Sequence, residues 1–251
     1  MSQEKIRLNK YIAHAGICSR RDADQYIASG KVRVNGSVCK ELGVKVSPQD
    51  RVTVNGQLIE PEPFVYLIMN KPRDTITTTS DEKGRKTVMD IVEHETGQRL
   101  YPVGRLDRNT TGIILLTNDG DLANRLMHPS YMVRKVYEVE TRRPLSDEEL
   151  TLLRTGIQLE DGPAKAYRVS RDPSQPAWIT ISMHEGRNRI VRRMIETLGT
   201  EVVRLDRVGY GPLNKKGLRV GRWRKLRYRE INELRKMVKL LPLDHLERKK
   251  A

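Results

Sequence analysis

The sequence predicts an α+β protein with two domains, the first small and the second larger. Within residues 1–60, two stretches with helical spacing of apolar residues precede strands that alternate in polarity and end in Asn-Gly. After this part, apolar strands are interspersed with short helices that have recognisable capping residues. Residues 61–63, Pro-Glu-Pro, read as a short stiff linker. We therefore expect domains over 1–60 and 61–241, followed by a flexible basic tail over 242–251.

The small domain is predicted to hold two helices followed by a few strands. Apolar residues keep helical spacing over residues 6–15, and Gly16 can end that helix. Ser19 is a typical N-cap for the second helix, and Asp22 can complete a capping box. The pattern V-R-V-N-G lies within residues 31–36, and V-T-V-N-G lies within residues 51–56. An alternating strand that ends in Asn-Gly is the strongest short signal for a β-hairpin.

Arg20 and Arg21 fall in the first turn of the second predicted helix. Positive charge at this end opposes the helix dipole, at a cost of a few tenths of a kcal/mol or more. The conflict is explained if a phosphate group binds nearby, because helix N-termini attract anions. Two solvated arginines are the simpler alternative.

The larger domain is predicted to alternate strands and helices. The boundaries rest on apolar runs, on capping residues and on terminating Gly or Pro. The expected strands span 66–69, 113–116, 134–141, 179–183 and 202–208, with a basic strand pair over 218–229. The expected helices begin at Asn118 or Asp119, at Ser146 with Glu149 in a capping box, after Gly186, and near Ile231, while 73–87 is a Thr-rich loop and 88–92 a short helix or turn.

The stretch V-G-R-L-D-R-N-T-T-G at 103–112 directly precedes the buried strand at 113–116. Asp107 therefore lies on irregular backbone beside a central strand, between Arg105 and Arg108. A carboxylate between two arginines is poised for electrostatic work. The alternative is a structural Asp that caps a nearby threonine or pairs with an arginine.

A second arginine-rich stretch follows the strand at 179–183. A glycine turn at Gly186 is predicted to open a helix carrying Arg187, Arg189, Arg192 and Arg193. Backbone N–H groups at such a helix start, together with guanidinium groups, make an anion site. An Arg-rich solvated face is the alternative.

The net charge of +15 is distributed unevenly. Residues 1–60 hold 10 basic and 6 acidic residues, a net of +4, and residues 185–251 hold 20 and 8, a net of +12. Residues 61–184 carry a net charge of −1. A neutral centre between two basic ends fits a reaction chamber whose flanks grip nucleic acid, with a well-solvated basic surface as the alternative.

Cysteine, histidine and hydropathy patterns predict a cytoplasmic protein with no metal site and no membrane contact. Cys18 and Cys39 form no C-x-x-C pair and read as reduced thiols. The five histidines show no metal-ligand spacing. The N-terminus is polar, and no apolar run approaches the ~18 residues of a membrane span.

Three patches occur in order along the chain: G-R-L-D at 104–107, K-V-Y at 135–137 and E-G-R-N-R-I-V-R-R at 185–193. The first domain, with R-L-N-K-Y-I, S-R-R and V-x-V-N-G, resembles the small RNA-binding domain named after a small-subunit ribosomal protein. Together these motifs resemble bacterial ribosomal-RNA pseudouridine synthases of the RsuA/RluB type over residues 6–241. The resemblance implies a catalytic domain built on a mixed, mostly antiparallel sheet.

The resemblance also implies the reaction and the partner. Such an enzyme isomerises a uridine to pseudouridine and needs no cofactor or metal. The expected substrate is ribosomal RNA or a pre-ribosomal particle, and the expected state is a monomer. The segment Leu126–Pro129 looks nearest to enzymes of the large ribosomal subunit.

The family's functional residues fall on particular positions of this chain. Asp107 matches the catalytic aspartate, and Arg192 matches the arginine that pairs with it. Tyr137 matches the tyrosine that stacks on the displaced base; taken alone, it reads as a partly buried core residue. Val191 matches the residue on the other face of the base, and Arg105 matches one near the vacated stack. The two arginine-rich helix starts described above add Arg187, Arg189, Arg20 and Arg21 as expected phosphate contacts.

Two departures and two rival functions accompany this interpretation. Ile190 stands where relatives usually carry Gln, and Arg73-Asp74 follows Pro72 where a glycine is common two residues later. A non-catalytic RNA-binding ribosome-assembly factor would need the basic ends but not Asp107. A phosphatase with an aspartate nucleophile would want a second Asp two residues on, where Asn109 stands.

Overall fold

The computed structural model describes residues 5–92 and 97–243 and contains two compact units, divided between Phe64 and Val65. The linker residues belong with the first unit, because the Glu62 backbone N–H donates to the His14 carbonyl oxygen (3.0 Å) and the Phe64 ring stacks on His14. The division therefore falls shortly after the boundary that the Pro-Glu-Pro segment predicts.

The first unit packs two helices beside a small antiparallel sheet with strand order β3-β2-β5-β6. Its elements are β1 (Ile6–Arg7), α1 (Leu8–His14), α2 (Arg20–Ala28), β2 (Val32–Val34), β3 (Ser37–Val38), β4 (Lys45–Val46), β5 (Val52–Val54) and β6 (Gln57–Ile59). Ser19 caps α2 and forms the predicted capping box with Asp22. Both Asn-Gly pairs have positive φ at both residues, as a two-residue type I′ hairpin turn requires.

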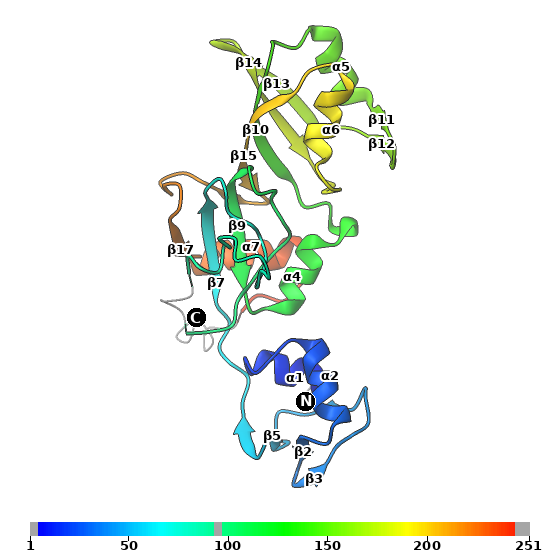
Figure 1. Cartoon of the computed structure of the whole chain (residues 1–251), viewed down its shortest axis with the longest axis vertical. Helices are drawn as coiled ribbons and strands as arrows, with labels where there is room; N and C mark the ends of the chain where they lie inside the picture. The colour runs from blue at the N-terminus through cyan, green and yellow to red at the C-terminus, as the bar shows by residue number, and fades with distance from the viewer. Residues whose placement is uncertain (1–4, 93–96, 244–251) are drawn as a thin grey trace. The chain divides into compact units, whose positions relative to one another are not determined.

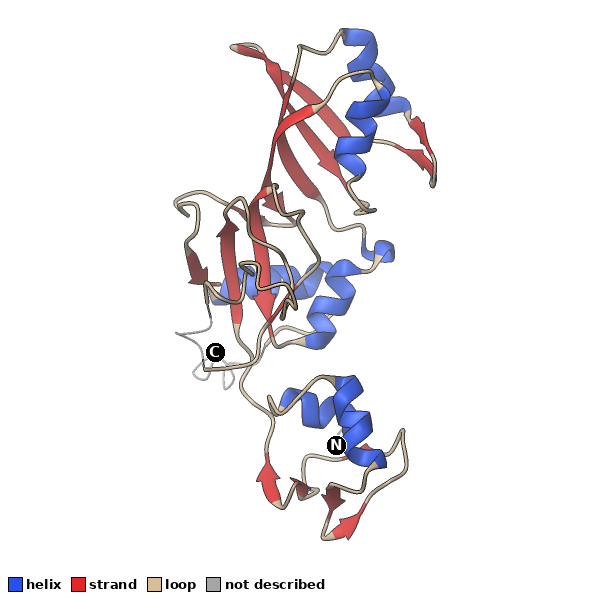
Figure 2. Cartoon of the chain, viewed as in Figure 1, coloured by secondary structure: helices blue, strands red, loops and turns tan. Residues whose placement is uncertain are grey.

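The second unit is built on a sheet with strand order β13-β14-β10-β15-β9-β7-β17 (Figures 1 and 2). Neighbouring strands on this path are antiparallel except β9 and β15, which run parallel. The mixed, mostly antiparallel sheet is confirmed. Its strands are β7 (Tyr66–Lys71), β8 (Tyr101–Pro102), β9 (Thr111–Thr117), β10 (Lys135–Thr141), β13 (Arg168–Asp172), β14 (Gln175–Met183), β15 (Val202–Tyr210), β16 (Leu213–Asn214) and β17 (Trp223–Lys225).

Helices lie against both ends of this sheet. Figure 2 shows α5 and α6 beside the end formed by β10, β13 and β14, and α4 and α7 beside the end formed by β7 and β9. The bounds are α4 (Gly120–Met127), η1 (Pro129–Tyr131), α5 (Asp147–Thr155), α6 (Ile190–Thr197) and α7 (Tyr228–Met237), with the hairpin β11 (Ile157–Leu159) and β12 (Gly162–Ala164) next to α6. Asp119 and Ser146 cap α4 and α5 as predicted.

The predicted basic strand pair at 218–229 is wrong. Trp223–Lys225 alone forms a strand, and Arg227 is already the N-cap of α7. The Glu230 carboxylate accepts hydrogen bonds from the Arg227 backbone N–H (2.7 Å) and from the Arg224 guanidinium. Because these bonds stabilise a helix start at Arg227, the chain forms α7 here and not a second strand. Gly221, with φ +75°, breaks the extended pattern before β17.

Residues 88–92 form turns rather than a helix. The predicted tail lies mainly outside the described residues, which end at Leu243. Leu243 itself is buried, and its backbone N–H donates to the Asn232 side-chain oxygen (2.9 Å). Across the described residues, every helix is too short or too polar to cross a bilayer.

Candidate active site

Asp107 lies on an irregular loop between β8 and β9, and this loop is firmly held. The Thr77 hydroxyl bridges the backbone of Leu106, donating to its carbonyl oxygen (3.0 Å) and accepting from its N–H (3.2 Å). The Thr110 N–H donates to the Asp107 carbonyl oxygen (3.0 Å), which closes a turn. The Asp107 side chain remains 33% exposed, so a ligand can reach a carboxylate whose backbone is fixed.

Gly112 explains why the loop leads into β9 at this position. It pairs with Arg207 on the parallel strand β15, and its φ is +109°. A Cβ atom here would lie 2.3 Å from the Arg207 carbonyl oxygen. The glycine that ends the 103–112 motif therefore permits the close approach of two strands next to the Asp107 loop.

The arginine-rich stretch does not form one continuous helix. Helix α6 begins at Ile190, and Arg189 is its N-cap in the left-handed conformation, with φ 49°. The expectation that the helix carries all four arginines is therefore wrong, because Arg187 and Arg189 precede it. This turn distributes the four guanidinium groups between two different carboxylates.

Arg192 and Arg189 face Asp107. The Arg192 Nε atom lies 3.9 Å from the Asp107 Oδ2 atom, and Arg189 Nη1 lies 4.0 Å from the same oxygen. The structure thus brings together the aspartate and arginine that the sequence pairs. Both distances suit ion pairs but exceed those of hydrogen bonds. Within the described ranges, the Asp107 carboxylate accepts no hydrogen bond from the protein. Its oxygens therefore face two guanidinium groups and can still accept a hydrogen bond from a ligand.

Arg192 is held by its surroundings rather than by Asp107. Its side chain is 11% exposed, and its Nη1 donates to the Val202 carbonyl oxygen (3.1 Å). Its Nε is buried and has no hydrogen-bond partner among the residues described. Burial, followed by repulsion from Arg189, lowers the pKa of Arg192. A guanidinium with a lowered pKa is still charged at neutral pH.

Lys71 is a site residue that the sequence reasoning missed. Its side chain is fully buried at the end of β7, and its Nζ donates to the carbonyl oxygens of Pro72 (2.9 Å), Thr75 (2.7 Å) and Arg108 (3.2 Å). Burial lowers the pKa of Lys71 to about 8, and attraction to Asp107 opposes that change. The available signal was a lysine that follows closely on the apolar run 67–69 within one strand.

Tyr137 and Val191 belong to the apolar core that adjoins the Asp107 loop. Their side chains are 9% and 3% exposed, and they share one contiguous cluster with Leu106. Ile190 is also buried in it, so the residue that replaces the usual Gln serves packing. The Tyr137 hydroxyl makes no hydrogen bond to any residue that the structure describes, and it remains available to a ligand.

The other predicted substrate contacts have different surroundings. Arg105 is exposed. Arg187 is not brought to Asp107: it binds the Glu185 and Asp161 carboxylates and donates to three backbone carbonyl oxygens of the β11–β12 hairpin. Arg20 and Arg21 are exposed at the start of α2 in the first unit. Their roles in binding RNA stay predictions.

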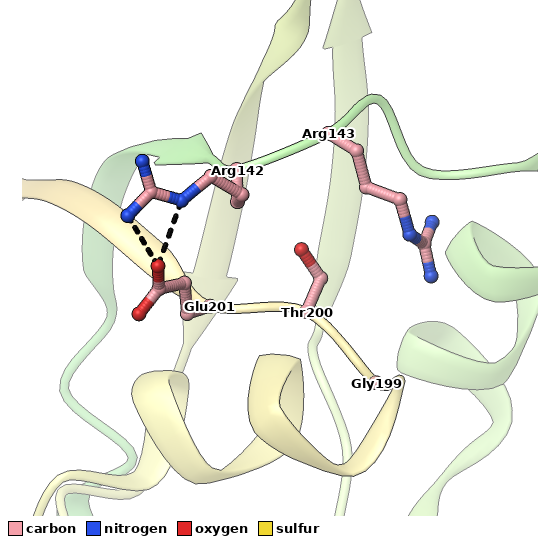
Figure 3. Close-up of a pocket in the computed structure, with 5 residues that line it drawn as sticks. All are labelled: Arg142, Arg143, Gly199, Thr200 and Glu201. Carbon is pink, nitrogen blue, oxygen red and sulfur yellow. Dashed lines mark hydrogen bonds and ion pairs between the residues drawn. The ribbon is translucent and has the colours of Figure 1, made fainter.

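A pocket of about 390 Å³ lies at the other end of α6 (Figure 3). It is lined by Arg142, Arg143, Gly199, Thr200 and Glu201. Arg142 pairs with Glu201. The Arg143 side chain points away from that pair in Figure 3 and forms an ion pair with Glu149. Its two cations are therefore compensated, and it contains none of the groups around Asp107.

Comparison with known proteins agrees with the geometry. A family model described as RNA pseudouridylate synthase matches residues 65–197, and an S4 domain model matches residues 6–52. The chain is 48% identical over 233 residues to ribosomal large subunit pseudouridine synthase B of Bacillus subtilis (strain 168), covering 91% of this chain and 95% of that protein. It is 38% identical over 241 residues to dual-specificity RNA pseudouridine synthase RluF of Shigella flexneri, covering 95% of this chain and 81% of that protein.

A crystal structure of a pseudouridylate synthase matches with a TM-score of 0.66 at 29% identity, over 91% of this chain and 99% of that one. The family indicated by the three sequence motifs is therefore confirmed. The carboxylate, the two facing arginines and the fold all point the same way. The chain belongs to the RNA pseudouridylate synthase family and carries an S4 domain before its catalytic domain.

Proposed function

We propose that this chain converts a specific uridine of large-subunit ribosomal RNA to pseudouridine, with Asp107 as the catalytic residue. The observation that carries the proposal is the Asp107 carboxylate, which has two guanidinium groups at 3.9 and 4.0 Å and no hydrogen-bond donor from the described residues. A carboxylate with this environment can form a new contact to a sugar or a base.

The reaction exchanges one bond for another within the same nucleotide. The glycosidic bond between C1′ and N1 breaks, the base turns over, and a bond between C1′ and C5 forms. The proton that C5 loses is balanced by a proton gained at N1. Asp107 serves this exchange either by attacking the sugar or the base, or by stabilising a positively charged sugar.

The residues around Asp107 have complementary roles. Arg192, held by the Val202 carbonyl oxygen, keeps the negative charge in place. Tyr137 and Val191 supply apolar surfaces on either side of the flipped base, which replace stacking lost in the RNA. Extruding a uridine costs a few kcal/mol. Phosphate contacts from Arg105, Arg189 and the S4-domain residues Arg20 and Arg21 offset that cost.

Ribosomal RNA of the large subunit is the proposed substrate because the Bacillus subtilis relative is named for that subunit. The target sits in free RNA or in a pre-ribosomal particle, and the enzyme acts as a monomer in the cytoplasm without a cofactor. Light scattering of the purified protein checks the oligomeric state, and cell fractionation checks the location.

The test is reverse-transcription mapping of carbodiimide-treated ribosomal RNA from cells that lack the gene. We expect one or a few pseudouridines to be missing from large-subunit RNA. Wild-type protein should restore them, and Asp107→Asn should not. A complete pseudouridine map in the deletion strain would contradict the ribosomal assignment. Full restoration of any lost function by Asp107→Asn would instead support a non-catalytic assembly factor.

A further inference from the structure

We propose that residues 215–225, here called the basic arm, form a phosphate-binding surface that holds RNA beside the active site. This inference rests on the proposed function, because it assigns part of the RNA contact to a segment outside the catalytic motifs. The arm holds six basic residues in eleven and no acidic residue. It follows β16 and includes β17.

Four of the arm's cations lack a carboxylate partner among the described residues. Lys215 pairs with Asp206, and Arg224 pairs with Glu230. The remaining four side chains are exposed, and no ion pair joins them to any residue in the part of the chain that the structure describes; they are Lys216, Arg219, Arg222 and Lys225. By contrast, Arg142, Arg143, Arg187 and Arg193 of the same unit are each matched by a carboxylate. Uncompensated cations on one short segment suit a polyanion.

The arm's backbone is fixed to the strand that leads into the active site. Asn70 on β7 is 4% exposed and makes three hydrogen bonds to the arm. Its backbone N–H donates to the Arg222 carbonyl oxygen (2.9 Å), its carbonyl oxygen accepts from the Gly221 N–H (2.8 Å), and its Nδ2 donates to the Leu218 carbonyl oxygen (2.8 Å). The arm is therefore preorganised, which reduces the entropy lost on binding.

The next residue connects the same strand end to the Asp107 loop. Lys71 donates to the carbonyl oxygen of Arg108, the residue after Asp107. An RNA backbone held by the arm is thus positioned relative to the catalytic loop through two consecutive residues of β7. The partner is RNA phosphate rather than an acidic protein, because the domain that carries the arm belongs to a family acting on RNA.

The experiment compares two triple variants with the same loss of charge in the full-length protein. The arm variant is Lys216→Gln, Arg219→Gln and Arg222→Gln. The matched control is Arg154→Gln, Lys165→Gln and Arg168→Gln, three exposed cations elsewhere on the catalytic domain. The probe is unmodified large-subunit ribosomal RNA transcribed in vitro, with its Kd measured from 50 to 300 mM KCl and its KM and kcat from pseudouridine formation.

We expect the arm variant to raise Kd and KM at least about 10-fold near physiological salt. The slope of log Kd against log salt should fall by about 2, since each lost phosphate contact removes roughly 0.7–0.9. Its kcat at saturating RNA should stay within about 2-fold of wild type, and the control should match wild type throughout. Replacing Arg219 and Arg222 by Lys should retain most of the salt slope, because the charges remain.

Unchanged Kd, KM and salt slope in the arm variant would overturn the proposal, as would a loss in the control of the same size. A lower kcat with unchanged Kd would also overturn it, since the arm would then act through the fold. The proposed function fails separately, if wild-type protein forms no pseudouridine. The binding measurements need no turnover, so they test the arm in that case too.

Discussion

Two carboxylates in the catalytic domain each meet two arginines from residues 187–193, yet their environments differ. Asp161, between β11 and β12, is bound by Arg187 at 2.9 Å and by Arg193 at 2.8 and 2.9 Å. Asp107 faces Arg192 and Arg189 at 3.9 and 4.0 Å, beyond hydrogen-bond distance. Asp161 thus accepts three hydrogen bonds from arginine side chains, whereas Asp107 faces two guanidinium groups and accepts a hydrogen bond from neither.

We interpret the difference as that between a structural carboxylate and the proposed catalytic one. Hydrogen bonds from Arg193, with added attraction from Arg187, hold the pKa of Asp161 below its usual range and tie the β11–β12 hairpin to the start of α6. Nothing comparable engages the oxygens of Asp107 among the described residues. The conformation of Arg189 at the head of α6 makes this division possible, because it turns the chain between Arg187 and Arg192.

The largest expected effect is that of Asp107→Asn. It removes the negative charge while keeping the shape of the side chain. Loss of a residue that acts covalently or as the main charge lowers kcat by at least about 10⁴-fold. Steady-state pseudouridine formation measures this, and a melting curve serves as the control. The melting temperature should be unchanged, since the Asp107 oxygens accept no hydrogen bond from the described protein. A variant with more than a tenth of wild-type kcat would remove Asp107 from the chemistry.

Arg192→Gln should have the second largest effect. Removing the better buried of the two facing cations is expected to lower kcat by about 10²–10³-fold, the range for one lost electrostatic group in an active site. Arg192→Lys should recover part of this loss, because the charge returns without the contact to Val202. Equal kcat for wild type and Arg192→Gln, measured with the same RNA, would show that Arg189 alone supplies the positive charge that the Asp107 carboxylate needs.

Lys71 extends the comparison to the cation beneath the Asp107 loop. Its pKa is lowered to about 8, so between pH 8 and its unfolded value near 10.5 the unfolded chain binds more protons than the folded one. The contribution of Lys71 to the free energy of unfolding should therefore rise with pH across this window. Below pH 8 the lysine is charged in both states, so the full cost of burying its charge lowers the free energy of unfolding. Urea unfolding at pH 7.5, 8.5 and 9.5 checks the slope.

In Lys71→Met the rise between pH 8 and 9.5 should be smaller but not absent. Lys135, whose pKa burial also lowers to about 8, retains its own contribution. If the free energy of unfolding rises equally steeply with pH in wild type and in Lys71→Met, burial does not lower the pKa of Lys71 and this prediction is wrong.

Asp161→Asn should have the smallest effect on chemistry. We expect kcat within about 3-fold of wild type, because Asp161 does not face the substrate site, and a modest fall in the melting temperature. The stabilisation by Asp161 should be present above its unfolded pKa and disappear as the pH falls through the lower folded value. Thermal melts of wild type and variant from pH 7 to pH 3 should converge at the acid end. A kcat loss as large as that of Asp107→Asn would erase the distinction between the two carboxylates.

Local features of this fold could be predicted because their determinants lie a few residues apart. The capping boxes of Ser19 with Asp22 and of Ser146 with Glu149 each join residues three positions apart, and both are present. The Asn-Gly hairpins are equally local. The strand pair expected at 218–229 failed because the alternation of basic and apolar residues could not reveal that Glu230 binds Arg224 and starts α7.

The site could be predicted in part. The motifs indicated Asp107 and its pairing with Arg192, and the structure places them together. The division of four arginines between two carboxylates depends on the left-handed Arg189 and on a hairpin some 26 residues earlier, which no local pattern encodes. Lys71 was missed because its partners are backbone carbonyl oxygens brought together by the fold.

The most direct test is single-turnover pseudouridine formation by Asp107→Asn and Asp161→Asn, with excess enzyme over one unmodified ribosomal RNA and with RNA affinity measured in parallel. We expect both variants to bind RNA as wild type does. Asp161→Asn should form pseudouridine at close to the wild-type rate, and Asp107→Asn should form none within the time of many wild-type turnovers. Product formed by Asp107→Asn at a rate near that of Asp161→Asn would contradict this expectation.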